Sequence, residues 1–243
     1  MMKITYIQHS GFAVELADKV LIFDYYKGEL PSFESDRDVY VFVSHRHYDH
    51  FQRSIFQWAE EFPRIPYILS GDVKEAVPSS APKEKIHFVG SGERLRIGDG
   101  EGTFLVETLR STDEGVAFVV ETEGRTIYHA GDLNWWHWEE ETDRYNQLMK
   151  KAYQKEIGKL EGLHIDAAFV PLDPRLGKEY YWGLDWFMRH TDTDIVFPMH
   201  MQGQYGLYER LMEEKTSAGY RDRVAHITGE GRSLHLTKSD TGA

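Results

Sequence analysis

Histidine and aspartate are concentrated in one short stretch of the chain. The segment SHRHYDH places His45, His47, Asp49 and His50 directly after the apolar run 39–43. Residues at i and i+2 of an extended segment project to the same side, so His45 and His47 can hold one cation, while Asp49 and His50 reach a second. Imidazole and carboxylate ligands without thiolate suit zinc, and also iron or manganese. A polar loop with scattered histidines is the alternative interpretation, but this density of ligand types favours a metal site.

Two later segments supply further ligand-type residues at the ends of apolar runs. Asp132 follows Gly131 in IYHAGDL, and His200 follows the run 195–199. A carboxylate can bridge two cations more readily than an imidazole nitrogen can. Strand ends at one edge of a pair of packed sheets can converge, so we expect Asp132 and His200 to join the first cluster. For His200 alone, a structural role would be an equal alternative.

The expected elements place these residues at strand ends. Two strand-rich blocks, each followed by helical segments, predict two β-sheets packed face to face with helices outside. The segments around Gly124 predict a hairpin, and 223–228 with 232–237 predict a closing hairpin. The expected strands are 3–7, 12–17, 19–25, 38–44, 66–70, 85–90, 93–98, 103–111, 115–123, 125–131, 165–173 and 194–200, and the expected helices are 54–62, 139–160, 180–190 and 206–215.

The ligand motifs resemble those of the metallo-β-lactamase superfamily. SHRHYDH matches its H-x-H-x-D-H signature, and HAGD and PMH match two later motifs in the expected order. The opening segments ITYIQHSGFAVEL and KVLIFD are similar to the branch that contains ascorbate-6-phosphate lactonase and related hydrolases. The resemblance covers essentially the whole chain. It implies a single α+β domain over residues 1–243, a four-layer αββα sandwich with the site at one edge between the sheets.

The resemblance also implies a cofactor and a ligand set. The cofactor would be two divalent metal ions, with zinc expected and manganese or iron as alternatives. Asp24, after the expected third strand, would resemble the aspartate that supports the ligands from behind. The implied ligands are His45 and His47 for the first metal, Asp49, His50 and His200 for the second, and Asp132 between the two.

One departure from the superfamily pattern concerns the first metal. The superfamily usually supplies a further histidine between the first motif and HAGD, but residues 110–113 here are Arg, Ser, Thr and Asp. Asp113 could substitute through oxygen, and His9, which precedes a glycine turn, could approach the metals. His87 lies within an expected strand, which favours a structural role. We therefore expect the first metal site to be weak, completed by water, partly occupied or empty, whereas the second has a full set of protein ligands.

The expected reaction is hydrolysis of an ester, lactone or phosphodiester of a small, anionic molecule by a metal-bound hydroxide. Asp49 would orient the nucleophile or accept its proton besides binding metal. Candidate substrate contacts are Asn134 and His137, in the tryptophan-rich stretch after Asp132, and Arg175. The tryptophans either wall a pocket or anchor the following helix, and Arg175 either holds an anion or lies in a solvated loop. The alternative function is a non-hydrolytic metal-binding or diiron redox protein on the same fold.

Composition limits the partners. The 243 residues carry a formal net charge of −12 and no block of lysine and arginine, which disfavours a nucleic-acid polymer and favours a small-molecule substrate. There is no cysteine, so thiolate ligands and disulfides are excluded. The N-terminal segment lacks the apolar core of a signal peptide, and no run approaches the ~20 apolar residues of a membrane span. We therefore expect a cytoplasmic protein without a membrane partner; the sequence does not predict its oligomeric state.

Overall fold

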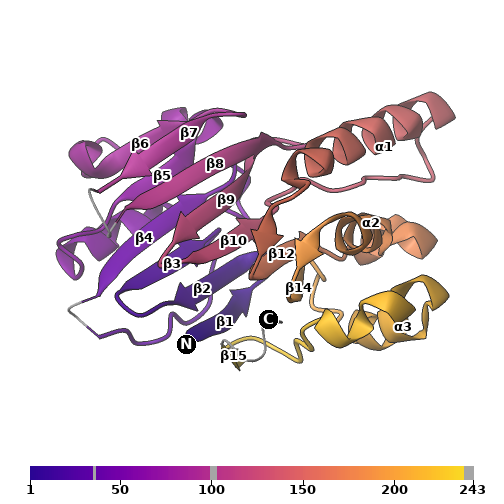
Figure 1. The fold of residues 1–243 in the computed structure, drawn as a ribbon. Coiled ribbons are helices and arrows are strands. Elements are labelled where there is room, and N and C mark those ends of the chain that lie inside the picture. The colour runs from indigo at the N-terminus through magenta and orange to yellow at the C-terminus, as the bar shows by residue number, and fades with distance from the viewer. Residues whose placement is uncertain (35–36, 99–102, 238–243) are drawn as a thin grey trace.

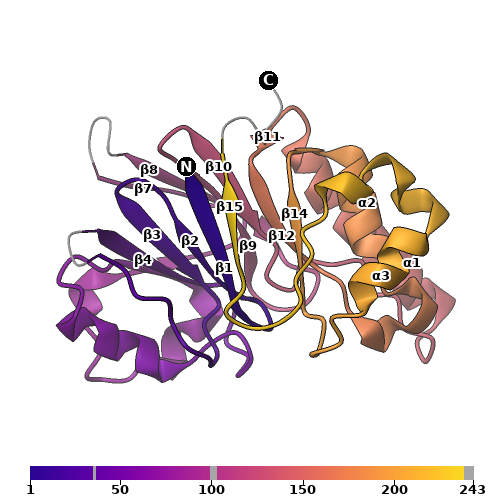
Figure 2. The same cartoon turned by 90° about the horizontal axis from the view of Figure 1, so that it is seen from below.

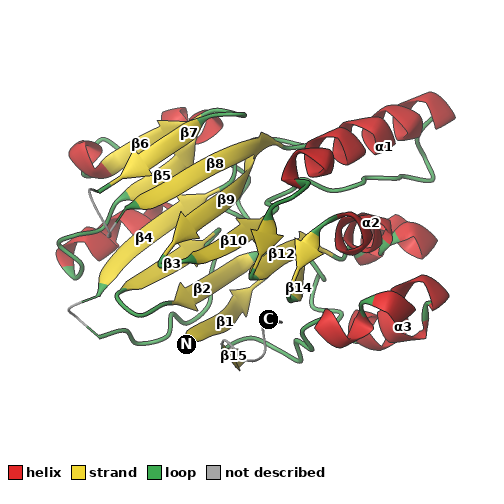
Figure 3. Cartoon of the chain, viewed as in Figure 1, coloured by secondary structure: helices red, strands yellow, loops and turns green. Residues whose placement is uncertain are grey.

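Two β-sheets pack face to face in the computed structural model, which describes residues 1–34, 37–98 and 103–237. Figure 1 shows the sheets side on, and Figure 2 shows helical segments on the outer side of each sheet. The secondary-structure colouring in Figure 3 separates the strands from the helices at the periphery. The expected α+β sandwich with helical outer layers is confirmed.

The first sheet is built mainly from the N-terminal strands. Its order within the described residues is β15-β1-β2-β3-β4-β5-β6. Strands β15, β1, β2 and β3 pair antiparallel, whereas β3 to β6 pair in parallel. The strands are β1 (Met2–Gln8), β2 (Gly11–Glu15), β3 (Lys19–Phe23), β4 (Asp38–Val43), β5 (Tyr67–Ser70), β6 (Ile86–Val89) and β15 (Ser233–Leu236).

The second sheet has the order β14-β12-β10-β9-β8-β7 within the described residues. Strands β7 to β10 form an antiparallel meander, and β10, β12 and β14 are parallel. The strands are β7 (Arg94–Ile97), β8 (Phe104–Arg110), β9 (Val116–Thr122), β10 (Arg125–His129), β12 (Ala167–Pro171) and β14 (Val196–Met199), and β11 (His164–Ile165) pairs separately with β13 (Asp192–Thr193).

Helices connect the parallel strands because parallel neighbours need a crossover. In the second sheet, α1 (Asp143–Ile157) lies between β10 and β12 in sequence, and α2 (Trp182–His190) lies between β12 and β14. The Thr142 hydroxyl accepts a hydrogen bond from the Tyr145 amide and caps the start of α1. The remaining helical segments of the described residues are α3 (Leu207–Glu213) and the 3₁₀ turns η1 (Arg53–Glu60), η2 (Gly71–Ala76), η3 (Lys83–Lys85), η5 (Gly158–Leu160), η6 (Pro174–Glu179), η7 (Lys215–Gly219) and η8 (Arg221–Arg223).

Strand β3 illustrates why its sequence is apolar at every central position. Leu21 and Phe23 point into the core between the sheets, whereas Val20 and Ile22 point into a second core under the outer helical turns. Successive side chains of a strand face opposite sides, so a strand covered on both faces needs apolar residues throughout.

Two expectations about elements are corrected by the structure. The segment 54–62 contains the 3₁₀ helix η1 rather than an α-helix. The closing hairpin is wrong: β15 pairs antiparallel with β1, while Val224 forms a bridge with Val196 of β14. The turn residues between the two segments suggested that they pair with each other. Instead, β15 joins the edge of the first sheet, and the segment around Val224 lies along the edge of the second. None of the helices in the described part of the chain has the length and hydropathy of a membrane span.

Candidate metal centre

Five strands end at one edge of the sandwich, and each is followed by a ligand-type side chain. Strands β3 and β4 of the first sheet lead to Asp24 and His45, and β10, β12 and β14 of the second sheet lead to Asp132, Asp173 and His200. Carboxyl ends of parallel strands meet at the same edge of a sheet, and sites form there. The ligand-type residues that follow separate strands in the sequence therefore lie close together in the folded chain.

The first ligand group consists of His45, His47 and Asp132. Their candidate ligand atoms all lie within 4.8 Å of one another. His45 Nε2 lies 3.0 Å from His47 Nδ1 and 3.5 Å from Asp132 Oδ2. His47 is the outer member, with its Nε2 3.5 Å from Glu114 Oε2. This group offers two nitrogens and one oxygen to a cation.

The second ligand group consists of His9, Asp49, His50 and His200, again with all ligand atoms within 4.8 Å of one another. His9 Nε2 lies 3.3 Å from Asp49 Oδ2. The second carboxylate oxygen of Asp132, Oδ1, lies 3.2 Å from His50 Nε2 and 3.4 Å from His200 Nε2. One carboxylate therefore faces both groups, Oδ2 toward the first and Oδ1 toward the second.

Four buried polar atoms at this edge have no hydrogen-bond partner within the described residues. They are Asp132 Oδ1 and the Nε2 atoms of His9, His50 and His200. A buried polar group without a partner costs about 1–3 kcal/mol, so such groups are rare unless something else satisfies them. Their convergence fits a bound cation, which would take lone pairs from all four.

Three histidines are held so that their Nε2 atoms face the centre. The Nδ1 of His50 donates to Asp24 over 2.8 Å, and that of His45 lies 2.9 Å from the Ser44 hydroxyl, which itself donates to Asp24. The Nδ1 of His200 donates to Asp173 over 2.7 Å. Metal-ligating histidines typically use the second nitrogen in this way, which fixes the tautomer. Asp24 thus holds His50 directly and His45 through Ser44.

Asp173 was missed by the sequence analysis, although its neighbour Arg175 was named. Its signal was present: PLDP follows a buried strand in the same way that GD and PMH do. Burial opposes ionisation of Asp173, but hydrogen bonds from His200 and Arg175 hold its pKa below the usual range. The side chain is fully buried and joins His200 to the Arg175 guanidinium, whose Nη2 lies 2.6 Å from Asp173 Oδ2.

His9 reaches the centre because of its backbone. It lies in the turn between β1 and β2 with φ of 57°, and His200 has φ of 64°. The His200 amide donates to the His9 carbonyl over 3.1 Å, which ties the first sheet to the second at this edge. Left-handed backbone is uncommon for residues other than glycine and concentrates at functional sites.

Burial sets the charge of the imidazoles. It lowers the pKa of His45 and of His50 to about 4, with the neighbouring imidazole of His50 adding to the effect at His45. For His200, burial acts in the same direction, but the carboxylates of Asp132 and Asp173 outweigh it and raise the pKa. Burial likewise opposes ionisation of Asp132, but the imidazoles of His50, His200 and His45 lower its pKa on balance. The metal-free centre is therefore an anionic carboxylate among largely neutral imidazoles.

Acid should destabilise the metal-free protein. Below pH 6.5, the ordinary pKa of histidine, His45 and His50 take up protons in the unfolded chain but stay neutral in the folded protein. Because the unfolded state then binds more protons, the free energy of unfolding falls as the pH is lowered from 6.5 toward 4. His200 opposes this trend with its raised pKa, but it is one group against two. Urea unfolding of chelator-treated protein at pH 7, 6 and 5 measures the slope, and His45→Gln should make it shallower. A flat profile in the unsubstituted protein would contradict the assignment of neutral buried imidazoles.

The place of the missing histidine is occupied by a loop that supports the Asp132 segment. The Thr112 hydroxyl donates to the Asn134 carbonyl over 2.6 Å and accepts from the Asn134 amide over 3.0 Å. Asp113 lines the cavity beside the centre but belongs to neither ligand group. Burial, aided by the nearby Asp132 carboxylate, raises the pKa of Asp113.

Glycine is required where this loop meets the first ligand strand. Gly115 has φ of 71°, and a Cβ there would lie 2.0 Å from the Ser44 carbonyl oxygen and 2.6 Å from His45 Cβ. Gly124 has a similar φ of 64°, but a Cβ there would meet nothing within 4 Å. The two positions share the strain of a left-handed backbone and differ in whether a neighbouring atom leaves room for a Cβ.

Gly115→Ala should therefore lower the free energy of unfolding by about 3 kcal/mol or more, because the clash with Ser44 adds to the left-handed strain. Gly124→Ala should lower it by only about 1–2 kcal/mol, the cost of the strain alone. Denaturant unfolding of both variants measures the difference. Equal losses would show that the close approach to Ser44 carries no energetic cost.

A cavity of about 380 Å³ opens over the centre. We call it the metal-centre cavity. Among its lining residues are Asp49, Asp132 and His200 from the ligand groups and Arg175 from the predicted substrate contacts. The other two predicted contacts lie elsewhere. The Asn134 side chain is buried against Gly183, and His137 lines a different cavity.

Fold and site together form an αββα sandwich with a cluster of candidate metal ligands at the strand ends. The model of a family described as "Beta-lactamase superfamily domain" matches residues 3–149, and the chain belongs to this superfamily. The resemblance of the motifs is thereby confirmed.

Individual relatives are similar at lower identity. A "UPF0173 metal-dependent hydrolase" from Pyrobaculum calidifontis is 28% identical over 141 residues, which cover 54% of this chain and 61% of that protein. The match thus spans about three fifths of that relative. Among solved structures, Igni18, a metallo hydrolase from Ignicoccus hospitalis, has a TM-score of 0.65 at 16% identity and covers 97% of this chain and 99% of that one. The metallo-beta-lactamase fold protein YhfI from Bacillus subtilis has a TM-score of 0.63 at 14% identity, with 97% and 100% coverage. These likenesses establish the fold.

Proposed function

We propose that this protein is a metal-dependent hydrolase that acts on an ester, lactone or phosphodiester of a small, anionic molecule. The observation that carries the proposal is the placement of Asp132, whose two carboxylate oxygens face two separate ligand groups. Such a carboxylate suits a pair of divalent ions, which when bound lower the pKa of water and polarise a carbonyl or phosphoryl oxygen. Zinc is the proposed metal, with manganese and iron as alternatives, because the donors are nitrogen and oxygen only.

The two ligand groups differ in completeness. The second has four side chains plus Asp132, and three of its nitrogens and one oxygen lack any other partner. The first has two histidines plus Asp132, and its outer member His47 is partly exposed, with a side-chain accessibility of 40%. We therefore propose that the first ion is held more weakly and is the first to be lost on dialysis.

Asp49 is assigned to bind metal and to orient the attacking water. Burial opposes its ionisation, but the nearby imidazoles of His9 and His50 outweigh it and hold the pKa of Asp49 well below its usual range. A carboxylate with so low a pKa is a weak base, so proton acceptance is the less favoured of the two roles expected from the sequence.

The position of Arg175 favours an anionic substrate. Its guanidinium is fixed by Asp173 and lies 5.9 Å and 5.7 Å from the ring centroids of Trp136 and Trp138. The two indoles are stacked at 5.8 Å and line the metal-centre cavity together with Arg175. A substrate would meet an aromatic wall on one side and a positive charge at its end.

A hydrolase panel with metal-reconstituted protein tests this function. The panel holds bis(p-nitrophenyl) phosphate as the phosphodiester, a phosphorylated sugar lactone and its unphosphorylated counterpart, and a thioester. We expect turnover on one class, with Arg175→Met raising KM for the phosphorylated lactone more than for the neutral one. Arg53→Met, which alters an exposed arginine of η1 that does not line this cavity, is the matched control.

Metal analysis of the same preparation separates the alternatives. Up to two zinc or manganese ions per chain agree with a hydrolase. Iron with an oxygen-sensitive optical spectrum, and no turnover on the panel, would instead indicate a diiron redox protein. Less than one ion per chain after reconstitution would indicate a metal-binding protein without catalysis.

A further inference from the structure

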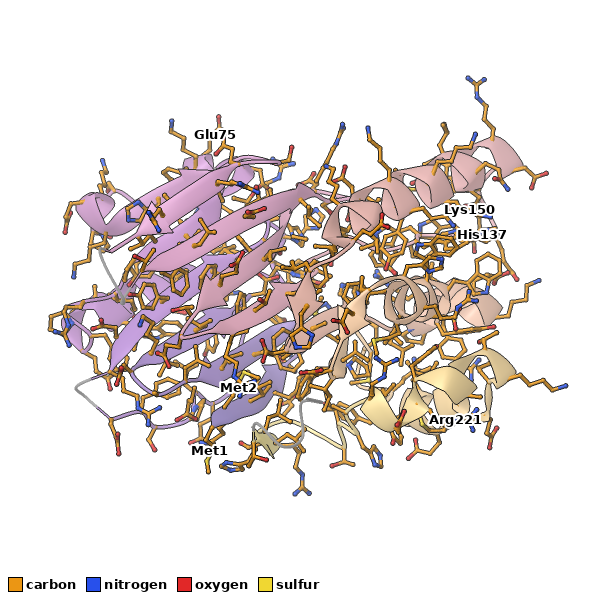
Figure 4. The ribbon with its side chains drawn as sticks, viewed as in Figure 1. Met1, Met2, Glu75, His137, Lys150 and Arg221 are labelled. Atoms are coloured by element: carbon orange, nitrogen blue, oxygen red, sulfur yellow. The ribbon has the colours of Figure 1, made fainter. Side chains whose placement is uncertain are left out.

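Three tryptophans line a second cavity beside the metal-centre cavity. This tryptophan cavity has a volume of about 390 Å³, similar to that of the metal-centre cavity, and both volumes fall in the range of small-molecule sites. Its lining comes from α1, from α2 with the preceding Tyr181, from the loop that follows Asp132, and from Thr216 of η7. Figure 4 labels two of its residues, His137 of the loop and Lys150 of α1, which lie near each other.

The loop that follows Asp132 forms a wall between the two cavities. Trp136 and Trp138 line the metal-centre cavity, whereas Trp135 and His137 line the tryptophan cavity. Such alternation is what an extended segment produces. The side chain of Asn146 on α1 fixes the loop, accepting from the Trp138 amide over 3.1 Å and donating to its carbonyl over 2.8 Å. The two cavities are thus separate sites that share one ordered wall.

The tryptophan cavity presents indole faces that are only partly covered: Trp186 stacks on His190 at 3.6 Å between ring centroids, and the Lys150 ammonium lies over Trp135. Trp135 lies 5.3 Å from Trp182 and 6.0 Å from Trp186 between ring centroids, and His137 meets Trp182 edge-on at 4.9 Å. All three indoles are only partly buried, unlike the large side chains of the core. Indoles around an open volume suit a planar ring, which can stack or meet them edge to face.

One positive charge in this cavity is uncompensated. Arg189 is paired with Asp185 over 2.9 Å, and Asp185 also accepts from the Tyr220 hydroxyl. The Lys150 ammonium lies 5.1 Å from the Trp135 ring centroid, and no carboxylate of the described residues pairs with it. In a chain with a net charge of −12, a cation left free beside indoles points to an anionic ligand.

We propose that the tryptophan cavity is a second binding site, and that its ligand is a small aromatic anion of one or two rings bearing a carboxylate. The ring would lie against Trp135 and Trp182, and the carboxylate would pair with Lys150. This site is separate from the metal centre, and the proposal stands whether or not the hydrolase function does.

Binding of 2-naphthoate tests the site, with neutral 2-naphthamide as the matched ligand. Titration of the metal-loaded protein is followed by intrinsic tryptophan fluorescence and by calorimetry. We expect saturable binding of 2-naphthoate about tenfold tighter than that of 2-naphthamide, the effect of one charge-assisted contact. Lys150→Met should abolish this preference, and Trp182→Leu should weaken both ligands.

Two control variants locate the bound ligand. Lys151→Met alters the next lysine on α1, which is exposed and lines neither cavity, and should leave binding unchanged. Arg175→Met should also leave it unchanged; a loss there would place the naphthoate in the metal-centre cavity and overturn the proposal. Absence of saturable binding up to millimolar ligand, or an unaltered preference in Lys150→Met with a native circular dichroism spectrum, would overturn it as well.

Discussion

Asp132→Asn is expected to lower kcat/KM of the metal-reconstituted protein by about 10²–10³-fold or more, on whichever substrate the unsubstituted protein hydrolyses. Asparagine keeps the shape of the side chain but loses its charge, and an amide nitrogen cannot bind a cation. The three imidazoles that now face Asp132 at 3.2 to 3.5 Å would then surround a neutral group. Metal content should fall together with activity, because Asp132 belongs to the first ligand group and also faces His50 and His200 of the second.

Activity and metal content per chain are measured on the same preparation. Asp222→Asn, at an exposed aspartate of η8, is the matched control and should change neither. A thermal melt establishes that the Asp132 variant is folded. If the folded variant kept more than a tenth of its activity and its full metal content, Asp132 would not be the shared ligand.

Chelation is expected to lower the melting temperature by about 5–10 °C. A ligand present at 100 times its Kd stabilises the folded state by about 2.7 kcal/mol, and for a chain of this length 1 kcal/mol corresponds to about 2–4 °C. The physical reason is that four buried ligand-type atoms have no hydrogen-bond partner among the described residues, so removal of a bound cation would leave them unsatisfied.

Scanning calorimetry with and without chelator, followed by addition of zinc, manganese or iron(II), measures the shift and identifies the metal that restores it best. His200→Ala should melt at nearly the same temperature in both conditions, because the second group loses a ligand anchored by Asp173. An unchanged melting temperature in the unsubstituted protein would mean that no cation contributes to the folded state.

The sequence predicted those parts of the centre that depend on local pattern. An apolar strand followed at once by a ligand-type residue located Asp132 and His200, and the period of two along an extended segment related His45 to His47. The same regularity predicted the two-sheet architecture, because buried strands need continuous apolar runs.

Local pattern failed where side-chain direction depends on backbone angles or on distant partners. The glycine turn indicated that His9 could approach the metals, but its place in the second group depends on a positive φ that the sequence does not specify. Asp173 matters through His200, a residue 27 positions away on the adjacent strand. Asn134 and His137 were predicted to face the substrate, but the alternating loop directs His137 to the other cavity, and the interior takes up the Asn134 side chain.

The ligands of the second group come from both sheets, and the His9 carbonyl and His200 amide join the same two sheets through the backbone. A cation at this edge would therefore act as a cross-link between two halves of the core, with His9, Asp49 and His50 on one side and His200 on the other. The metal affinity would then depend on how the two sheets pack against each other. Substitutions in the core packing between the sheets, such as at Phe12 against Phe169, should change the metal affinity although neither residue is a candidate ligand.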